Sequence, residues 1–450
     1  MGAGKSTIGE EVARQSGRPF VDLDREIERR HGAIAALFES SEPTFRSSEE
    51  QLAAQVLSAT RPGVIALGGG AVLSERTRRL LREHAFTVWI DVEIGEAWNR
   101  VRGGDRPLAR DETSFRRLFE EERRPLYDST SDDVASSVED VLLAALQIRV
   151  ARGQLAELQL PEPSALIADE HVLGLQPLPL QPLPLQPQEV HRVPRGEAAK
   201  TPAVLERLWR ELELGRDGTI VAYGGGSTTD VAGLAAATYL RGVRWLAVPT
   251  TLLGQVDAAI GGKTAIDLSA GKNLVGAIHY PAAVVSDPDV LATLTEAQRR
   301  EGLAEVVKTG LLAERPLWEL DDDAMIRATA SFKAAVCLGD PFDRGRRAIL
   351  NLGHTFAHAL EAAAGYEGLM HGNAVALGLL AALRLSGRST DVVEDVLGPR
   401  PVAVDRDRAW AALGRDKKAG LVLLGDDGPR WDVRLPDSEV RRALDELIAD

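Results

Sequence analysis

A glycine-rich segment, Tyr223–Asn273, carries the densest group of side chains in this sequence that could do chemistry. The apolar run Thr219–Ala222 before it is typical of a buried strand, and three consecutive glycines end that run. Glycine lets the backbone approach a ligand closely, and free backbone N–H groups can bind phosphate. Asp230 and Asp257 follow among further glycines. The pattern therefore predicts a ligand site; a sheet edge with tight turns is the plainer alternative.

A second strand is expected at Trp245–Val248, and it leads into Pro249-Thr250-Thr251. Beyond it we expect Lys263, Lys272 and Asn273 on glycine-rich turns. So many polar groups beside so many glycines favour ligand binding.

Three side chains farther along could bind a divalent metal ion: Glu305, His354 and His371. Two nitrogens and one oxygen with a position left open are a common arrangement for catalytic zinc. The pair His354 and His358 is weaker evidence by itself, because one helical face often carries two histidines for packing.

The chain opens with the end of a phosphate-binding loop. In this motif backbone N–H groups hold phosphate, the lysine reaches the transferring end and the serine hydroxyl binds magnesium. The residues concerned are Gly2, Ala3, Gly4, Lys5, Ser6 and Thr7. The complete motif needs a further glycine and a preceding strand, so we expect the natural start to lie upstream. The alternative is a decayed kinase-like domain that is kept for structure.

Composition limits the class of protein. A chain of 450 residues implies two or three domains. The net charge of −14 argues against a nucleic-acid partner, and no apolar run is long enough to span a membrane. The single cysteine, Cys337, cannot form an internal disulfide, which fits the reducing cytoplasm. We therefore expect a cytoplasmic enzyme that acts on small molecules.

Strand and helix patterns alternate through residues 1–145. Val64–Leu67 and Thr87–Asp91 are the clearest strands, and Val138–Leu146 is expected to be a closing helix. The proline-rich repeat Leu175–Pro187 is expected to be extended. After about Glu296 the apolar spacing becomes helical.

Residues 146–450 resemble 3-dehydroquinate synthase. The resemblance is carried by the glycine-rich segment, by Glu301–Lys308, by Arg347–His358 and by His371-Gly372. It implies an NAD-dependent and zinc- (or cobalt-) dependent conversion of a heptulosonate 7-phosphate to 3-dehydroquinate and phosphate. Hydride moves to NAD⁺ and later returns, and no single general base is assigned. Residues 146–450 depart from the family's usual pattern at Ser227-Thr228-Thr229. They also depart from it at Asn373, where the family usually has glutamate.

The same resemblance implies roles for individual residues. Glu305, His354 and His371 match the metal ligands. The positions around NAD are Asp169, Glu197, Lys200, Gly225, Gly226, Asp230, Thr250, Thr251, Lys272, Thr293 and Leu294. The substrate contacts are Asp257, Lys263, Asn273, Lys308, Lys333, Arg347, Asn351 and His358, with the C-terminal pair Lys417 and Lys418. Arg241 matches an arginine lent by a neighbouring subunit, so a homodimer is expected.

The phosphate-binding loop is followed by Asp22-Leu23-Asp24, by Phe45-Arg46 with Glu49, by Gly68-Gly69-Gly70, by Arg106-Pro107-Leu108 and by Arg123-Arg124-Pro125-Leu126-Tyr127. Through this ordered set, residues 1–145 resemble shikimate kinase. The resemblance implies ATP with Mg²⁺, with Ser6 and Asp22 near the metal and Arg106 on a mobile lid. Shikimate contacts are implied for Asp24, Arg46, Gly68, Gly69, Gly70 and Arg123. Arginine suits the carboxylate of shikimate because a guanidinium pairs with it in two-point geometry.

The fold class predicted from these observations is α/β, in three domains. Residues 1–145 form a P-loop kinase-type parallel sheet whose first strand is missing. Residues 146–295 form a Rossmann-like NAD-binding domain, and residues 296–450 form a mainly helical metal-binding domain. The leading hypothesis is a bifunctional enzyme with both activities. The alternatives are a synthase with an inactive kinase-like scaffold, or a related sugar-phosphate cyclase that makes cyclitols.

Overall fold

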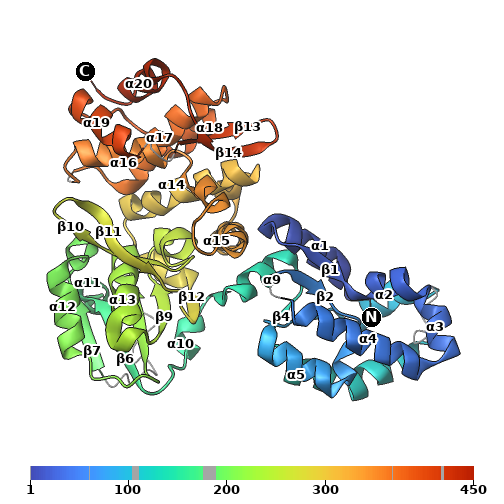
Figure 1. The fold of residues 1–450 in the computed structure, drawn as a ribbon. Coiled ribbons are helices and arrows are strands. Elements are labelled where there is room, and N and C mark those ends of the chain that lie inside the picture. The colour runs from blue at the N-terminus through green and yellow to red at the C-terminus, as the bar shows by residue number, and fades with distance from the viewer. Residues whose placement is uncertain are drawn as a thin grey trace. The chain divides into compact units, whose positions relative to one another are not determined.

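The computed structural model describes residues 2–59, 61–103, 111–175, 189–366, 368–416 and 420–449. The chain divides into two compact units, Met1–Leu146 (unit 1) and Gln147–Asp450 (unit 2). Figure 1 shows parallel strands with helices in both, and a mainly helical C-terminal region, so the predicted α/β class is confirmed. No helix among the described residues is long and apolar enough to cross a membrane.

Unit 1 contains two separate pairs of parallel strands. β1 (Phe20–Asp22) pairs with β2 (Val64–Ala66), and β3 (Val88–Ile90) pairs with β4 (Asp133–Ala135). Within the described part of unit 1, no strand joins the two pairs. The helices are α1 (Lys5–Ser16), α2 (Leu23–His31), α3 (Ile34–Ser40), α4 (Glu42–Leu57), α5 (Glu75–His84), α6 (Ile94–Val101), α7 (Glu112–Arg117), α8 (Arg124–Thr130) and α9 (Val138–Ala145).

Local sequence explains several of these boundaries. α1 lies between Gly4 and Gly17, and both glycines adopt the left-handed conformation that favours glycine. α9 begins with a capping box in which Ser137 and Asp140 exchange hydrogen bonds with backbone N–H groups. One core of unit 1 is formed by Leu23, Ile27, Phe45, Leu52 and Ala53, which α2 and α4 contribute.

Unit 2 begins with a six-stranded parallel sheet in the order β5-β12-β9-β8-β6-β7. Its strands are β5 (Ile148–Val150), β6 (Ser164–Asp169), β7 (Glu189–Val193), β8 (Thr219–Gly224), β9 (Arg244–Pro249) and β12 (Ala283–Ser286). Every residue of β6 and β8 is buried, which explains their nearly continuous apolar sequences. The accompanying helices are α10 (Gln154–Glu157), α11 (Glu170–Gly174), α12 (Pro202–Glu211) and α13 (Gly226–Thr238).

A hairpin stands where the sequence predicted glycine-rich turns for Lys263, Lys272 and Asn273. β10 (Lys263–Leu268) and β11 (Gly271–Ile278) pair in antiparallel fashion. Thr264 and Ile266 alternate with more exposed residues along β10. That period of two is typical of a half-buried strand, so the prediction of turns was wrong for this segment.

The second half of unit 2 is helical. Its helices are α14 (Glu296–Ala313), α15 (Asp322–Gly339), α16 (His354–Ala363), α17 (His371–Leu385), α18 (Asp391–Leu397), α19 (Arg406–Asp416) and α20 (Asp437–Asp445). A second hairpin, β13 (Leu421–Gly425) with β14 (Gly428–Val433), was not predicted. In Figure 1, α14 lies between the parallel sheet and the C-terminal helices.

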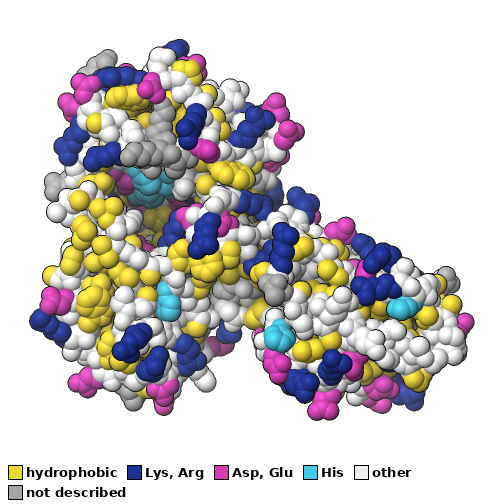
Figure 2. Space-filling model, in the orientation of Figure 1, with side chains coloured by type: hydrophobic (Ala, Val, Ile, Leu, Met, Phe, Trp, Pro, Cys, Tyr) yellow, Lys and Arg dark blue, Asp and Glu magenta, His cyan; other side chains and the backbone are white. Residues whose placement is uncertain are grey.

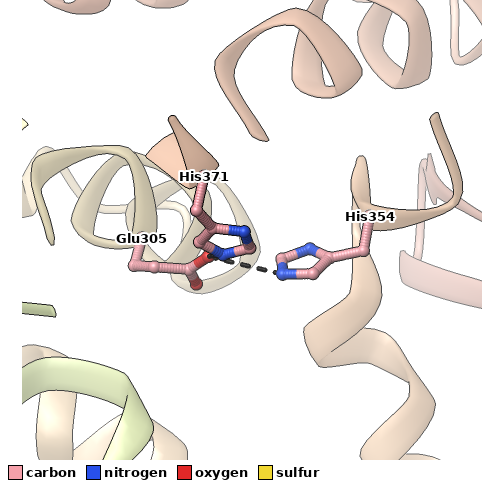
Figure 3. Close-up of side chains that lie close together, drawn as sticks. All are labelled: Glu305, His354 and His371. Atoms are coloured by element: carbon pink, nitrogen blue, oxygen red, sulfur yellow. Dashed lines mark ion pairs between the residues drawn. The ribbon is translucent and has the colours of Figure 1, made fainter. Parts of the chain in front are cut away.

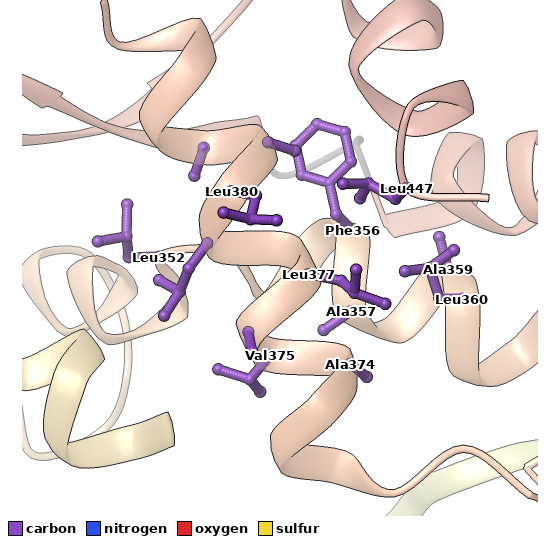
Figure 4. Close-up of a cluster of buried hydrophobic side chains, with 14 of the residues drawn as sticks. Leu352, Phe356, Ala357, Ala359, Leu360, Ala374, Val375, Leu377, Leu380 and Leu447 are labelled. Carbon is purple, nitrogen blue, oxygen red and sulfur yellow. The ribbon is translucent and has the colours of Figure 1, made fainter. Parts of the chain in front are cut away.

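The core of this half fixes the beginnings of α16 and α17. Phe356 and Leu360 of α16 pack with Leu377 and Leu380 of α17 (Figure 4). At the contact between the two helices, a Cβ on Gly378 would overlap the carbonyl of Gly353. Gly353 directly precedes α16 and has a φ of 79°. Close backbone packing therefore determines where His354 and His371, the first residues of the two helices, are placed.

Candidate active sites

Glu305, His354 and His371 converge from three helices (Figure 3). Their potential ligand atoms all lie within 4.8 Å of one another. The Nε2 atoms of His354 and His371 lie 3.4 and 3.6 Å from Glu305 Oε1. Figure 2 shows histidine side chains in a hollow of unit 2, between the hairpin β10–β11 and the C-terminal helices. This set of donors fits a catalytic zinc or cobalt ion.

Lys308 lies one turn after Glu305 on α14 and forms an ion pair with it. Their side chains are only 2% and 1% exposed. Burial by itself would raise the pKa of Glu305, but the Lys308 ammonium and His354 lower it well below its usual range. Glu305 therefore stays ionised, as a metal ligand must.

Both histidines are held through Nδ1, so that Nε2 faces Glu305. His354 Nδ1 lies 3.3 Å from the carbonyl oxygen of Leu352, and His371 Nδ1 lies 3.3 Å from Glu361 Oε1. Burial works against protonation of His371, but Glu305 and Glu361 raise its pKa to about 10. A metal ion at this position would therefore compete with a proton.

Several of the predicted substrate contacts lie close to this cluster. Lys333 donates hydrogen bonds to the backbone oxygen of Asp257 (2.7 Å) and to its carboxylate (2.6 Å). Burial would raise the pKa of Asp257, but Lys333 lowers it, with Glu305 and Lys308 as further charged neighbours. Asp257, Lys333, Glu305 and Lys308 thus form one network of alternating charge.

Arg347 is almost completely buried, at 2% exposed. Among the described residues its Nε has no hydrogen-bond partner, while Nη1 lies 3.4 Å from the carbonyl oxygen of Pro341. Gly261 has a φ of 96°, and a Cβ there would overlap the Arg347 guanidinium. The glycine therefore makes room for a cation whose hydrogen-bonding capacity is only partly used.

The predicted NAD positions gather at the carboxyl edge of the parallel sheet. Asp169 ends β6, and the glycine loop Gly224–Gly226 ends β8. The N–H of Thr250, just after β9, donates to the carbonyl oxygen of Gly224 (2.9 Å). Thr293 and Leu294 lie at the end of the short 3₁₀ helix Pro288–Thr293, which follows β12 in the chain.

This edge is also where the connections of the sheet diverge. The chain passes from β6 to β7 on one side, and from β8 to β9 on the other. Ligands of open parallel sheets bind at such a switch point. A Cβ on Gly224 would overlap Thr228 and come within 3.0 Å of Asp169 Cβ, so glycine allows the close approach of the strand ends.

Lys200, a predicted NAD position, connects a second one, Asp230, with the predicted substrate contact Asn273. Its Nζ lies 2.8 Å from Asp230 Oδ2 and 3.8 Å from Asp267 Oδ1, and it donates to the side chain of Asn273. Burial raises the pKa of Asp230 to about 6, although Lys200 opposes that shift. Asn273, with a φ of 56°, is fixed by a hydrogen bond from its N–H to Asp267 (2.7 Å).

Other predicted residues are more exposed. Asn351 lies just before α16, and His358 lies within it. The rings of His358 and His354 are 5.5 Å apart. Lys263 forms an ion pair with Asp343 at 2.5 Å. Arg241 is exposed and has a φ of 70°. The positions Arg106, Lys417 and Lys418, and most of the proline-rich repeat, lie outside the described residues.

In unit 1, the predicted phosphate-binding loop leads directly into α1. Gly2 and Gly4 have φ values of 74° and 83°, and no side chain caps the helix. The first turn contains Ser6 and Thr7, and its N-terminus is suited to an anion. Ala3, Lys5, Gly68, Gly69 and Tyr127 line one cavity of about 100 Å³. The loop that follows β2 therefore faces the same cavity as the phosphate-binding loop.

The predicted shikimate contacts surround this second loop. Arg46 Nη1 lies 2.7 Å from Glu49 Oε2, and a Cβ on Gly70 would overlap the guanidinium of Arg46. A Cβ on Gly68 would overlap both Glu49 and Asp24. Arg123 is 3% exposed. Asp22 ends β1 and caps α2 by accepting from the N–H of Arg25 (3.2 Å).

Comparison with known proteins identifies a family for each unit. The shikimate kinase family model matches residues 1–147. The models for the N-terminal and C-terminal parts of 3-dehydroquinate synthase match residues 190–301 and 302–397. Over 406 residues the chain is 32% identical to the bifunctional shikimate kinase/3-dehydroquinate synthase of Thermotoga maritima, covering 84% of this chain and 82% of that protein. The chain belongs to this bifunctional family.

Two solved structures resemble the synthase part of this family member. A 2-deoxy-scyllo-inosose synthase in complex with carbaglucose-6-phosphate, NAD⁺ and Co²⁺ is 25% identical, with a TM-score of 0.58. The match covers 66% of this chain and 96% of that one. The 2-epi-5-epi-valiolone synthase ValA of Streptomyces hygroscopicus subsp. jinggangensis 5008, with NAD⁺ and Zn²⁺ bound, is 26% identical, with a TM-score of 0.58. It covers 67% of this chain and 96% of that one.

Sequence reasoning did not assign Glu361, Glu301 or Asp267 to the site. Glu361 follows His354 by seven residues, which places both on one face of α16, so helical spacing was a usable signal. Glu301 lies four residues before Glu305 on α14, and its Oε2 accepts from the N–H of Gly372 (2.9 Å). Asp267 gave no such signal, because its contacts depend on the hairpin.

Proposed function

We propose that unit 2 carries out the 3-dehydroquinate synthase reaction, with zinc held by Glu305, His354 and His371 and with NAD at the carboxyl edge of the sheet. One observation carries the proposal: Lys272 connects the two regions. Its Nζ lies 3.8 Å from Glu197 Oε2, on the nucleotide side, and 4.0 Å from Glu361 Oε1, beside the metal ligand His371. A substrate bound near Lys272 would therefore reach both a metal ion and a nicotinamide.

The side chains suit the charges of the substrate. When bound, zinc polarises the substrate hydroxyl and NAD⁺ accepts the hydride. Lys333, Lys308 and Arg347 offer positive charge to a phosphate and a carboxylate. Because these groups are buried and already fixed by Asp257, Glu305 and Pro341, they are oriented before the substrate arrives. We assign binding and charge stabilisation to them, and no single general base.

The test is phosphate release from 3-deoxy-arabino-heptulosonate 7-phosphate by the full chain with NAD⁺ and zinc. Activity should be lost with a chelator and restored by zinc or cobalt. The resemblance to the inosose and valiolone synthases defines the alternative, in which another sugar phosphate is accepted instead. Turnover of another sugar phosphate, such as glucose 6-phosphate, without turnover of the heptulosonate, would contradict the proposal.

We propose that unit 1 phosphorylates shikimate with ATP and Mg²⁺. The shared cavity of the two loops supports this, since donor and acceptor must meet there. Ser6 and Asp22 would hold magnesium, and Asp24, Arg46 and Arg123 would bind shikimate. The assay is ATP-dependent formation of shikimate 3-phosphate, with Arg123→Lys as a variant in which two-point carboxylate binding is weakened. A full chain without this activity would favour the scaffold alternative.

We propose that unit 2 forms a homodimer through the hairpin β10–β11 and that Arg241 enters the partner's site. Hydrophobic side chains gather over this hairpin (Figure 2), where Leu268, Leu274, Val275 and Ile278 are 37–56% exposed. Light scattering should show a dimer that Leu274→Asp dissociates. If Arg241 acts across subunits, mixed Arg241→Ala and His371→Ala proteins should regain activity that neither has alone. We also propose that the chain divides into three domains, at 145/146 and at 295/296. We further propose that the protein is cytoplasmic.

A further inference from the structure

We infer that Glu361 is a positioning residue, whose buried carboxylate fixes the ring of His371 so that Nε2 is presented to the metal ion. The inference rests on the proposed metal site and adds a residue to it. Nothing in the sequence patterns assigned Glu361 a role.

The geometry of His371 carries the argument. Its Nδ1 lies 3.3 Å from Glu361 Oε1, while its Nε2 lies 3.6 Å from Glu305 Oε1. A neutral imidazole has one N–H and one lone pair, so the nitrogen that faces Glu361 donates and the other is left for the metal. Glu361 therefore sets both the tautomer and the orientation of the ring.

The surroundings of Glu361 suit this role. Its side chain is 5% exposed, and the cation Lys272 lies 4.0 Å from the same oxygen, Oε1. Glu361 and His371 lie on different helices, α16 and α17, which meet at the contact between Gly353 and Gly378. The carboxylate thus reaches His371 from a rigid, closely packed neighbour.

His354 has an equivalent arrangement with a different acceptor. Its Nδ1 faces the carbonyl oxygen of Leu352, which belongs to the backbone just before α16. Replacement of a side chain cannot remove that backbone acceptor, whereas Glu361 can be changed. Hydrogen-bond partners of this kind typically alter metal affinity by about 10- to 100-fold when they are removed.

The experiment measures zinc affinity of the full-length protein by competition with a chromophoric chelator. Glu361→Met keeps the length of the side chain and removes the acceptor, and Glu361→Gln keeps an acceptor oxygen. We expect zinc affinity to fall about 10- to 100-fold in Glu361→Met and markedly less in Glu361→Gln. Glu394→Gln, an exposed charge change on α18, is the control and should bind zinc like the parent.

A second readout separates positioning from packing. With Co²⁺ in place of zinc, the visible absorption spectrum should change in Glu361→Met and stay close to that of the parent in Glu361→Gln. Equal zinc affinity in the Met and Gln variants would overturn the inference and leave the metal site standing. A parent protein that binds no zinc would overturn the proposed site as well.

Discussion

The buried pair of Glu305 and Lys308 makes the sharpest prediction about the metal site. Lys308→Met keeps most of the apolar length of the side chain and removes its charge. Since Glu305 is 1% exposed, its carboxylate cannot find a replacement partner in water. We expect the metal-free variant to unfold more easily and, at the same time, to bind zinc more tightly than the parent.

The magnitude follows from the neighbours of Glu305. Removal of one partner of a buried ion pair destabilises a protein by about 3–5 kcal/mol. The pKa of His371 is raised to about 10, so this residue is positively charged at neutral pH without metal and partly compensates Glu305. We therefore expect the lower end, about 3 kcal/mol. Zinc supplies the missing positive charge, so most of that loss should disappear when the metal is bound.

The two effects are linked by a thermodynamic cycle. If zinc restores about 2 kcal/mol of stability, the zinc affinity of the variant rises about 30-fold over the parent. Lys308 in the parent repels the ion, and the variant does not. The gain in affinity must therefore equal the part of the lost stability that zinc restores.

Hydrogen exchange of the full chain, with chelator and with zinc, measures the local stability of α14 separately from unit 1. Chelator competition gives the zinc affinity of the same samples. Glu305→Gln combined with Lys308→Met removes both charges and should recover much of the metal-free stability. Equal destabilisation of Lys308→Met with and without zinc would refute the reasoning. So would a double variant as unstable as the single one.

Three further predictions concern other parts of the two sites. Asp230 has a pKa raised from 3.8 to about 6, so it destabilises the folded protein above that pH, and the effect disappears as the pH falls toward 4. Between pH 4 and pH 7, the stability of Asp230→Asn relative to the parent should therefore rise by at most about 3 kcal/mol, as measured by urea unfolding. A difference in stability that does not change with pH would count against the burial of this group. Gly378→Ala should push α17 away from Gly353, which should lower the free energy of unfolding by about 1–3 kcal/mol and weaken zinc binding. The control Gly414→Ala, at an exposed glycine, should leave zinc binding unchanged. Arg46→Met should raise the KM for shikimate. It should also destabilise unit 1, because Glu49 is 3% exposed and loses its partner. A second change, Glu49→Gln, should recover the stability but not the KM.

The sequence was informative wherever short-range spacing determines chemistry. Apolar runs predicted β2, β3, β8 and β9 to within about two residues. The signal is clearest for β8 and β9, which are almost completely buried, because a buried parallel strand must be apolar on both faces. Residue type made Glu305, His354 and His371 suitable metal ligands, since carboxylate and imidazole are ligands that zinc prefers, and the resemblance to 3-dehydroquinate synthase selected them among the other carboxylates and histidines. The hairpin β10–β11 was missed because its glycines were interpreted as turns, although Thr264 and Ile266 are spaced two residues apart between Lys263 and Asp267, as on one face of a strand.

What the sequence by itself determined is most of the chemical inventory of each site and, for the parallel strands and the helices of the metal ligands, the element that carries it. Only the tertiary structure decided which members meet. Glu361 reaches His371 because two glycines let α16 and α17 pack closely, and Lys272 reaches Glu361 because a hairpin carries it there. The physical reason is range: helical and strand periodicity fix the face on which a side chain lies, whereas contacts between helices depend on packing of residues far apart in the chain.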